Sequence, residues 1–171
     1  NGEYDDQKKW IQHYLDIPSF DLTSFTMTNQ KSKIPSATIT AELKMDRFAT
    51  ISGKRIFLTP NLMNRNSSVP EKVEDRTTDI VTDFAYVDFD TVRYELPEGI
   101  YPEFLPEDVT ITSRFGEYEA KYKVAAGRLV YTRKLKMNKG QFPASSYQEL
   151  IDFYRGVSKA DNMKMVFMSK T

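Results

Sequence analysis

A strict alternation of apolar and polar residues on both sides of a glycine turn, within residues 117–137, is the feature that most constrains this fold. A period of two is the period of a β-strand with one buried and one solvated face. The apolar members of the pattern are Tyr118, Ala120, Tyr122, Val124, Leu129, Tyr131, Leu135 and Met137. Between the two halves stands Ala125-Ala126-Gly127, where Gly127 can supply the positive φ that closes a short loop. The sequence therefore predicts a long antiparallel hairpin.

The same period extends over most of the chain, from about residue 18 to residue 137. Seven to nine short alternating segments recur about every ten residues, with Gly, Pro or Asn between them. This spacing is typical of an all-β sandwich. We therefore expect a mainly β fold, specifically an immunoglobulin-like antiparallel β-sandwich. Residues 61–76 are the longest weakly patterned stretch, and their polar composition predicts a loop whose order the sequence does not determine.

Helical periodicity is confined to the two ends of the chain. Near the N-terminus, Trp10, Ile11, Tyr14 and Leu15 have helical spacing, and Pro18 ends the pattern. After Pro143, an apolar stripe predicts a second helix, with Ser145 and Gln148 as a capping box. The stripe consists of Tyr147, Leu150, Ile151, Phe153, Tyr154 and Val157. Alternation returns at residues 163–167 and predicts a last strand.

These elements predict a linker helix over residues 1–17 and a single β-sandwich domain over residues 18–171. An end segment with large apolar side chains often buries them against a neighbour, so we expect Trp10, Tyr14 and Leu15 to form a domain interface. The chain opens with Asn1-Gly2-Glu3, with neither an initiator Met nor a signal-peptide pattern, and we expect it to be a segment of a longer protein.

Charge and hydropathy argue against two classes of partner. The 24 Lys and Arg balance the 24 Asp and Glu, and no three basic residues are adjacent, so we expect no nucleic-acid partner. The longest apolar runs have four residues, whereas a membrane-spanning helix needs about 18 or more, so we expect no membrane span.

The residues needed for common catalytic chemistry are mostly missing. Without any cysteine, the chain has no thiol nucleophile and no thiolate metal ligand. The single histidine, His13, has no serine near it in the sequence, and we interpret it as a solvent-facing helical residue. We therefore expect no catalytic residue, no metal site and no cofactor. An enzyme using two carboxylates stays an alternative, and the densest acidic cluster is Asp79, Asp83, Asp88 and Asp90.

Arg133 interrupts the apolar face of the hairpin between Tyr131 and Leu135. A charge on that face must be paired or must extend to solvent, so Arg133 can bind a ligand or can hold the structure together. We favour a structural role for Arg133, Tyr131 and Gly127, with the guanidinium reaching a carboxylate at the rim of the sandwich. Four other aromatics in or near the connections are candidates for glycan binding, although aromatics are more often core residues. They are Tyr86, Phe89, Tyr101 and Phe104.

Several short motifs occur in an order that resembles a known bacterial domain. The motifs are Ser52-Gly53-Lys54-Arg55-Ile56-Phe57-Leu58-Thr59-Pro60 with Asn64-Arg65, Tyr94-Glu95-Leu96-Pro97-Glu98-Gly99, Arg114-Phe115-Gly116-Glu117-Tyr118, Val130-Tyr131-Thr132-Arg133, Lys139-Gly140 through Pro143 to Tyr147, and Ala160-Asp161. With these motifs, the chain from about residue 10 onward resembles the uncharacterised C-terminal domain that follows a transglutaminase-like (papain-like thiol) core in envelope proteins of Gram-negative gut and soil bacteria.

The resemblance implies a larger protein in which an N-terminal β domain and a Cys-His-Asp core precede this chain. It also implies a periplasmic, envelope-attached or secreted location. The family's catalytic cysteine has no counterpart here, so its activity is not carried over to this chain. We therefore expect a non-catalytic accessory domain that packs on the upstream transglutaminase-like domain or presents substrate to it. The alternative is an adhesion module that binds glycan or protein.

Overall fold

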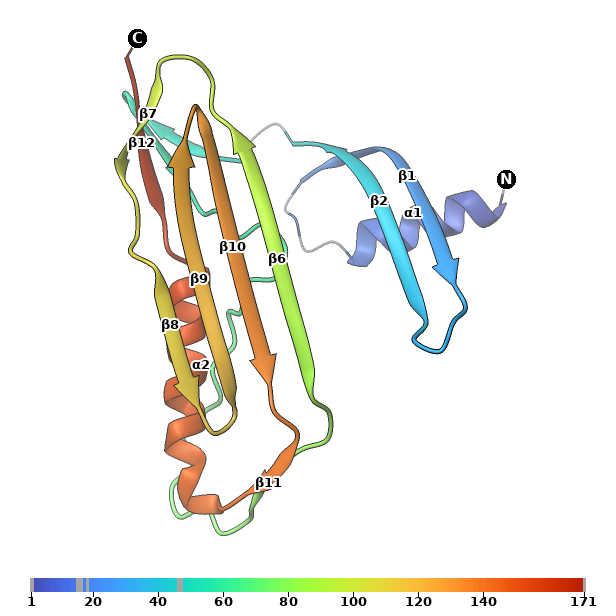
Figure 1. The fold of residues 1–171 in the computed structure, drawn as a ribbon, viewed down its shortest axis with the longest axis vertical. Coiled ribbons are helices and arrows are strands. Elements are labelled where there is room, and N and C mark those ends of the chain that lie inside the picture. Colours follow the sequence, from blue (N-terminus) through green and yellow to red (C-terminus); the bar gives the residue numbers. More distant parts are fainter. Residues whose placement is uncertain (1, 15–16, 18, 46–47, 171) are drawn as a thin grey trace. The chain divides into compact units, whose positions relative to one another are not determined.

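The computed structural model describes residues 2–14, 17, 19–45 and 48–170. The chain divides into two compact units, residues 1–48 and residues 49–171 (Figure 1). The first unit contains α1 (Gly2–Tyr14), β1 (Asp21–Gln30) and β2 (Ser36–Lys44). A helix is present over residues 2–14, within the predicted span of 1–17, and β1 and β2 lie with it in one unit, whereas our prediction groups them with the remaining strands. That residues 18–171 form one domain stays a prediction.

In the first unit, β1 and β2 pair as an antiparallel hairpin whose register shifts between Leu22 and Ser24. The ring of Tyr4 on α1 stacks on that of Phe25 on β1, with 4.8 Å between the ring centroids. This stacked pair joins the helix to the hairpin. Ile11, Ile17 and Leu22 are the buried apolar residues among those described in this unit.

The second unit is built around two four-stranded antiparallel sheets. The first sheet has the strand order β6-β10-β9-β8, and the second has the order β3-β4-β12-β7. The strands are β3 (Thr50–Ser52), β4 (Arg55–Leu58), β5 (Ile80–Thr82), β6 (Tyr86–Glu95), β7 (Ile100–Phe104), β8 (Val109–Ser113), β9 (Gly116–Ala125), β10 (Arg128–Met137), β11 (Gly140–Phe142) and β12 (Met165–Ser169). The short strands β5 and β11 pair only with each other.

The predicted hairpin is confirmed as β9 and β10. Tyr122 lies opposite Tyr131, and the inward-facing residues of both strands are more buried than their outward-facing neighbours. The connecting residues Ala126 and Gly127 have φ values of 49° and 70°. Two consecutive positive φ values are typical of a type I′ turn, whose twist matches that of the strands. Gly127 therefore takes the expected left-handed conformation, and Ala126 takes it as well.

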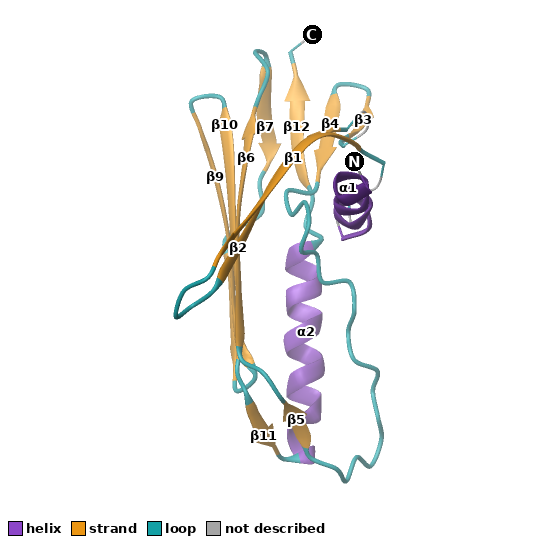
Figure 2. Cartoon of the chain, turned by 90° about the vertical axis from the view of Figure 1, so that its right-hand side faces the viewer, coloured by secondary structure: helices purple, strands orange, loops and turns teal. Residues whose placement is uncertain are grey.

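The inner face of the first sheet is covered by two different elements. At one end, α2 (Tyr147–Asp161) packs Leu150, Phe153 and Val157 against a core cluster that includes Phe115 and Tyr118. At the other end, Met165 and Phe167 of β12 and Leu58 of β4 pack against Leu129 of β10. Helix and second sheet lie on the same side of the first sheet (Figure 2).

The mainly β, antiparallel prediction with two helices is therefore confirmed. The immunoglobulin-like sandwich is not confirmed and stays a prediction, because α2 as well as the second sheet packs on the inner face of the first sheet.

The start of α2 differs from the predicted capping box. A 3-10 turn (Ala144–Ser146) precedes the helix, and the N-cap residue is Ser146, whose side chain makes no capping bond. Its hydroxyl instead donates to the carbonyl of Pro143 at 2.6 Å, and this bond tightens the turn. Further along, Gly156 lets the helix approach β8 closely, because a Cβ at this position would lie 2.8 Å from Cδ1 of Ile111.

Candidate functional site

Arg133 is the centre of a buried polar group, which we call the Arg133 cluster: Arg133 on β10, Asp90 on β6, Tyr118 on β9 and Asp161 at the end of α2. The side chain of Arg133 is 1% exposed and that of Asp161 is fully buried. Nε and Nη2 of Arg133 donate to the two carboxylate oxygens of Asp161 at 2.8 and 3.1 Å. Nη1 donates to Oδ2 of Asp90 at 3.1 Å. Arg133 thus joins the first sheet to the end of α2.

The cluster also fastens the segment between β4 and β5. The backbone N–H of Asn66 donates to Oδ2 of Asp161 at 2.9 Å, and the side-chain amide of Asn64 donates to Oδ1 of Asp90 at 2.6 Å. The Tyr118 hydroxyl donates to Oδ1 of Asp161 at 2.7 Å. Within the region that we expected to be a loop, residues 64–66 are therefore anchored to the core.

The electrostatics of the cluster favour one fixed protonation state. Burial by itself would lower the pKa of Arg133, but its hydrogen bonds and charge interaction with Asp161 raise that pKa above its usual value. Burial, together with the charge of Asp161, raises the pKa of Tyr118 far above that of an exposed tyrosine. The guanidinium is therefore charged and the phenol neutral at all ordinary pH values. Such a group resists proton transfer and suits a structural role.

The geometry differs from our expectation for Arg133 in one respect. We expected a carboxylate at the rim, whereas the bidentate partner Asp161 is fully buried and comes from α2. Asp90 on the neighbouring strand β6 is the partly exposed partner, at 21%. The sequence offered one signal for Asp161, since it is a charged residue directly after the apolar stripe of the helix. Tyr131 lies beside the cluster and is 1% exposed.

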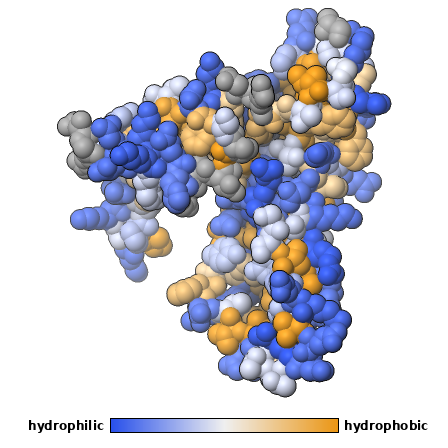
Figure 3. Space-filling model, turned by 180° about the vertical axis from the view of Figure 1, so that it is seen from behind, coloured by the Kyte–Doolittle hydropathy of each residue, from blue (hydrophilic) through white to orange (hydrophobic). Residues whose placement is uncertain are grey.

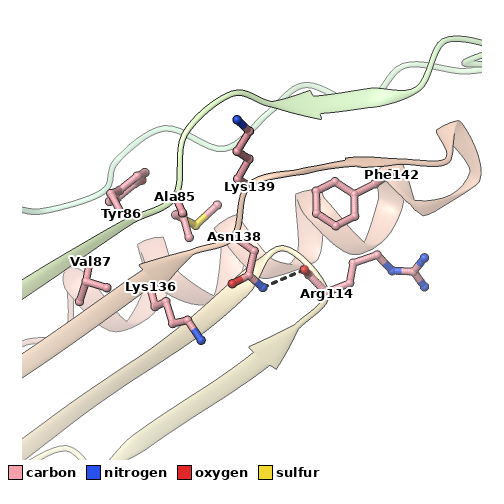
Figure 4. A pocket seen from close by; sticks show the side chains of 9 residues that line it. Ala85, Tyr86, Val87, Arg114, Lys136, Asn138, Lys139 and Phe142 are labelled. Atoms are coloured by element: carbon pink, nitrogen blue, oxygen red, sulfur yellow. Dashed lines mark hydrogen bonds between the residues drawn. The ribbon is translucent and has the colours of Figure 1, made fainter.

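An open pocket of about 780 Å³ lies at the end of the first sheet, where β6 begins and β10 leads into β11 (Figure 4). We call it the β6 pocket. Its lining residues are Ala85, Tyr86, Val87, Arg114, Lys136, Met137, Asn138, Lys139 and Phe142. The lining therefore includes apolar residues and three cationic residues, whose side chains point in different directions (Figure 4). The side-chain amide of Asn138 donates to the carbonyl of Arg114 at 3.0 Å and joins two of the lining segments.

Two of the three cations in the β6 pocket already have carboxylate partners. Arg114 pairs with Glu149 at 2.7 Å, and Lys136 pairs with Glu117 at 3.5 Å. Lys139 is exposed and forms no ion pair with any residue that the structure describes. The pocket therefore carries one uncompensated positive charge.

Exposed apolar side chains lie on β6 and just before it, close to this pocket. Phe84, Val87 and Phe89 are 80%, 57% and 69% exposed. β6 is an edge strand, because all of its register partners lie on β10. A long edge strand with exposed apolar side chains is a site for pairing with another chain. On the rear face of the molecule, in contrast, hydrophobic side chains form separate patches among hydrophilic ones (Figure 3).

The four aromatic candidates lie on two strands. Tyr86 and Phe89 are on β6, whereas Tyr101 and Phe104 are on β7, an edge strand of the second sheet. All four are between 41% and 69% exposed, so the view that they are core aromatics is wrong. Tyr101 lies under the ammonium group of Lys170, 5.9 Å from its ring centroid. Only Tyr86 of the four lines the β6 pocket.

The remaining candidates belong to the N-terminal segment. Trp10 is 47% exposed on α1, while Leu15 and the side chain of Tyr14 lie outside the described residues. His13 is exposed on α1. Within residues 2–14, 17, 19–45 and 48–170, no three His, Cys, Asp or Glu residues are placed to hold a metal ion.

Two of the four acidic residues of the carboxylate alternative, Asp79 and Asp90, are occupied in structural bonds. Asp79 accepts hydrogen bonds from the side-chain amide of Gln141 and the backbone N–H of Ala144, and Asp90 belongs to the Arg133 cluster. In the described part of the chain, no helix combines the length and the hydrophobicity needed to cross a bilayer.

Residues 54–167 match one family model, that of a domain of unknown function with a solved structure, DUF3858. The match runs from the start of β4 to the middle of β12 and so includes the Arg133 cluster and the β6 pocket. No curated protein and no solved structure matches the chain.

Proposed function

This chain belongs to the DUF3858 family of domains of unknown function, and on that premise we propose that it is a non-catalytic accessory domain that binds a neighbouring polypeptide. One observation carries the proposal. The charged groups of the core hydrogen-bond to one another in the Arg133 cluster, while apolar and cationic side chains remain exposed beside the free edge of β6. Buried and mutually paired charges stabilise a fold, whereas exposed apolar groups beside unpaired backbone favour binding.

The proposed context is a transglutaminase-like protein of the bacterial envelope, exported to the periplasm or beyond. In that protein the domain packs on the upstream catalytic core or holds substrate near it. The support is the order of short motifs from Ser52 to Asp161, together with a family match over residues 54–167 that covers most of them. The core would supply the Cys, His and Asp of the reaction, because this chain has no cysteine.

The test of this context begins with the gene that encodes the parent protein. We expect the sequence upstream of Asn1 to encode a Cys-His-Asp core. That core, expressed separately, should bind the present chain in isothermal titration calorimetry, and Phe89→Ser should weaken binding because it removes an exposed aromatic from the β6 edge. Ile51→Ser, at a residue that is 71% exposed on β3, is the matched control. An upstream region without such a core, or a core that does not bind, would refute the proposal.

A glycan-binding adhesion module is the second candidate, and the exposure of all four candidate aromatics favours it. Exposed aromatic rings can stack on sugar faces, and Tyr101 and Phe104 occupy a different strand from Tyr86 and Phe89. A glycan array tests this candidate. Binding that is lost in Tyr101→Ala or Phe104→Ala would support it, and a signal no higher than background would exclude it.

A further inference from the structure

We propose that the free edge of β6 and the adjoining β6 pocket bind an extended peptide whose C-terminal part is acidic, by adding the peptide as a fifth strand to the first sheet. The inference rests on the proposed function, because a domain that presents polypeptide to an enzyme needs a surface that holds an extended chain. It specifies the kind of polypeptide, the strand that holds it and its direction.

The edge of β6 is suited to a backbone ligand. The strand has ten residues, from Tyr86 to Glu95, and every one of them faces β10 on one side only. Alternate backbone N–H and C=O groups on the other side are therefore available to an added strand. The strand contains no proline and no bulge in its pairing with β10, so its hydrogen-bonding groups are regularly spaced. Pairing of this kind gives affinity through the main chain, and pockets for alternate side chains give specificity.

The charge on the outer face of this edge selects the sequence of the peptide, whereas Asp88 and Asp90 of β6 lie on the inner face, opposite Leu135 and Arg133. The exposed outer surface beside β6 carries Arg93, which forms no ion pair with a described residue, and Lys134 on the adjacent strand is likewise unpaired. At the pocket, Lys139 is also unpaired, while Lys136 shares only a 3.5 Å contact with Glu117. Carboxylates on a partner would complement these cations. A second copy of this chain would instead bring the same cations toward one another.

The direction of the peptide follows from the register of the sheet. β10 runs antiparallel to β6, so that its last residue, Met137, lies opposite Tyr86. An added strand that is also antiparallel to β6 ends at the same place, beside the β6 pocket. Antiparallel pairing is slightly more stable per residue than parallel pairing. The C-terminal residues of the peptide therefore lie close to Lys139 or Lys136, whose side chains point in opposite directions, and an apolar side chain among them can lie beside Tyr86 (Figure 4).

The probe is an N-acetylated octapeptide in which Thr and Val alternate in the first half and Glu and Val alternate in the second half. Binding to the full chain is measured by isothermal titration calorimetry and mapped by amide NMR shifts. We expect saturable binding with Kd below about 1 mM, shifts concentrated at residues 84–90, and weaker binding at higher salt. The peptide of reversed sequence, with Glu in its first half, should bind at least about threefold more weakly, because its carboxylates lie away from the pocket.

Two perturbations separate strand pairing from simple charge attraction. N-methylation of alternate peptide amides should reduce affinity more than about tenfold for one of the two alternating sets and little for the other, because only one set faces β6. Lys139→Glu should weaken binding about two- to fivefold, since an exposed ion pair contributes little. The matched control is Lys123→Glu, at an exposed residue on β9 of the same sheet that lacks an ion pair in the described structure.

Several outcomes would overturn the inference. One is the absence of peptide binding up to about 1 mM peptide. Another is an equal loss of affinity when either of the two alternating sets of peptide amides is N-methylated. Slow amide exchange along β6 without peptide would show that the edge is already paired, and a dependence of that protection on protein concentration would assign it to a second copy. Preferential binding of polygalacturonate over the peptide would assign the surface to acidic glycans. If the chain binds the catalytic core but not the peptide, only the inference about the β6 edge is refuted. If the chain binds the peptide but its gene encodes no such core, only the proposed function is refuted.

Discussion

Replacing Asp161 by Asn should destabilise the second unit by about 3–5 kcal/mol, the usual cost of removing one partner of a buried ion pair. The fully buried carboxylate of Asp161 accepts four hydrogen bonds, two of them from Arg133 and the others from Tyr118 and the backbone of Asn66. The amide of Asn offers one acceptor oxygen, and its nitrogen faces groups that are themselves donors. Asp90 alone then balances the buried guanidinium.

That loss is large compared with a typical domain stability of about 5–15 kcal/mol. With a urea m-value of about 2 kcal/mol per M, a loss of about 3 kcal/mol lowers the midpoint by about 1.5 M. Far-UV circular dichroism and near-UV tyrosine signals are suitable measurements for the second unit. Tryptophan fluorescence is not, because the only tryptophan is Trp10 in the first unit.

Glu95→Gln is the matched control, because Glu95 also accepts from an arginine at 2.8 Å but both side chains are more than half exposed. We expect this change to cost less than about 1 kcal/mol. The double variant Arg133→Met with Asp161→Leu should lose less than the sum of the two single changes, because neither charge is then left alone in the core. If Asp161→Asn shifts the urea midpoint no more than Glu95→Gln does, the reasoning about the Arg133 cluster is refuted.

Three further predictions concern other parts of the chain. Burial raises the pKa of Tyr122 to about 12, so as the pH rises the phenol loses its proton in the unfolded chain before it does so in the folded chain, and the free energy of unfolding falls between pH 10 and 12. Urea titrations at several pH values should show a smaller fall for Tyr122→Phe. An equal fall in the variant and the original chain would contradict this. Ala126→Asn should raise stability by about 0.5–1 kcal/mol, because Asn tolerates the left-handed conformation better; a lower thermal midpoint would argue against it. A chain beginning at Ala49 should unfold cooperatively in calorimetry, and a broad, non-cooperative transition would show that the units depend on each other.

The elements that the sequence predicted well are those with a long regular pattern. β9 and β10 have ten residues each, with an alternation interrupted at Val130 and Arg133, and the apolar stripe of α2 extends over three turns. A pattern of this kind indicates which face is buried but not what covers it. Consequently the division of one sheet face between α2 and β12 was not predictable, and the sandwich was the simplest assumption.

The candidate sites were harder to predict because they combine distant segments. Asp161 is 28 residues from Arg133, and Asn66 is 95 residues from Asp161, so no local spacing indicates that they meet. The β6 pocket similarly joins residues 85–87, Arg114 and residues 136–142. The exposure of Phe89 was missed for a different reason. Aromatic residues in strands are usually buried, and this ring is not because it lies on the outer face of the first sheet, which neither α2 nor the second sheet covers.

The place of β12 in the second sheet has a consequence for biosynthesis. β12 contains residues 165–169 and lies between β4 and β7, with Met165 opposite Leu58 and Met168 opposite Tyr101. The ribosome synthesises β12 after both of its neighbours, so β4 and β7 leave the exit tunnel before the strand that joins them. The nascent chain therefore carries two unsatisfied strand edges and an uncovered Leu129 until β12 emerges, and it needs protection from intermolecular pairing during that interval.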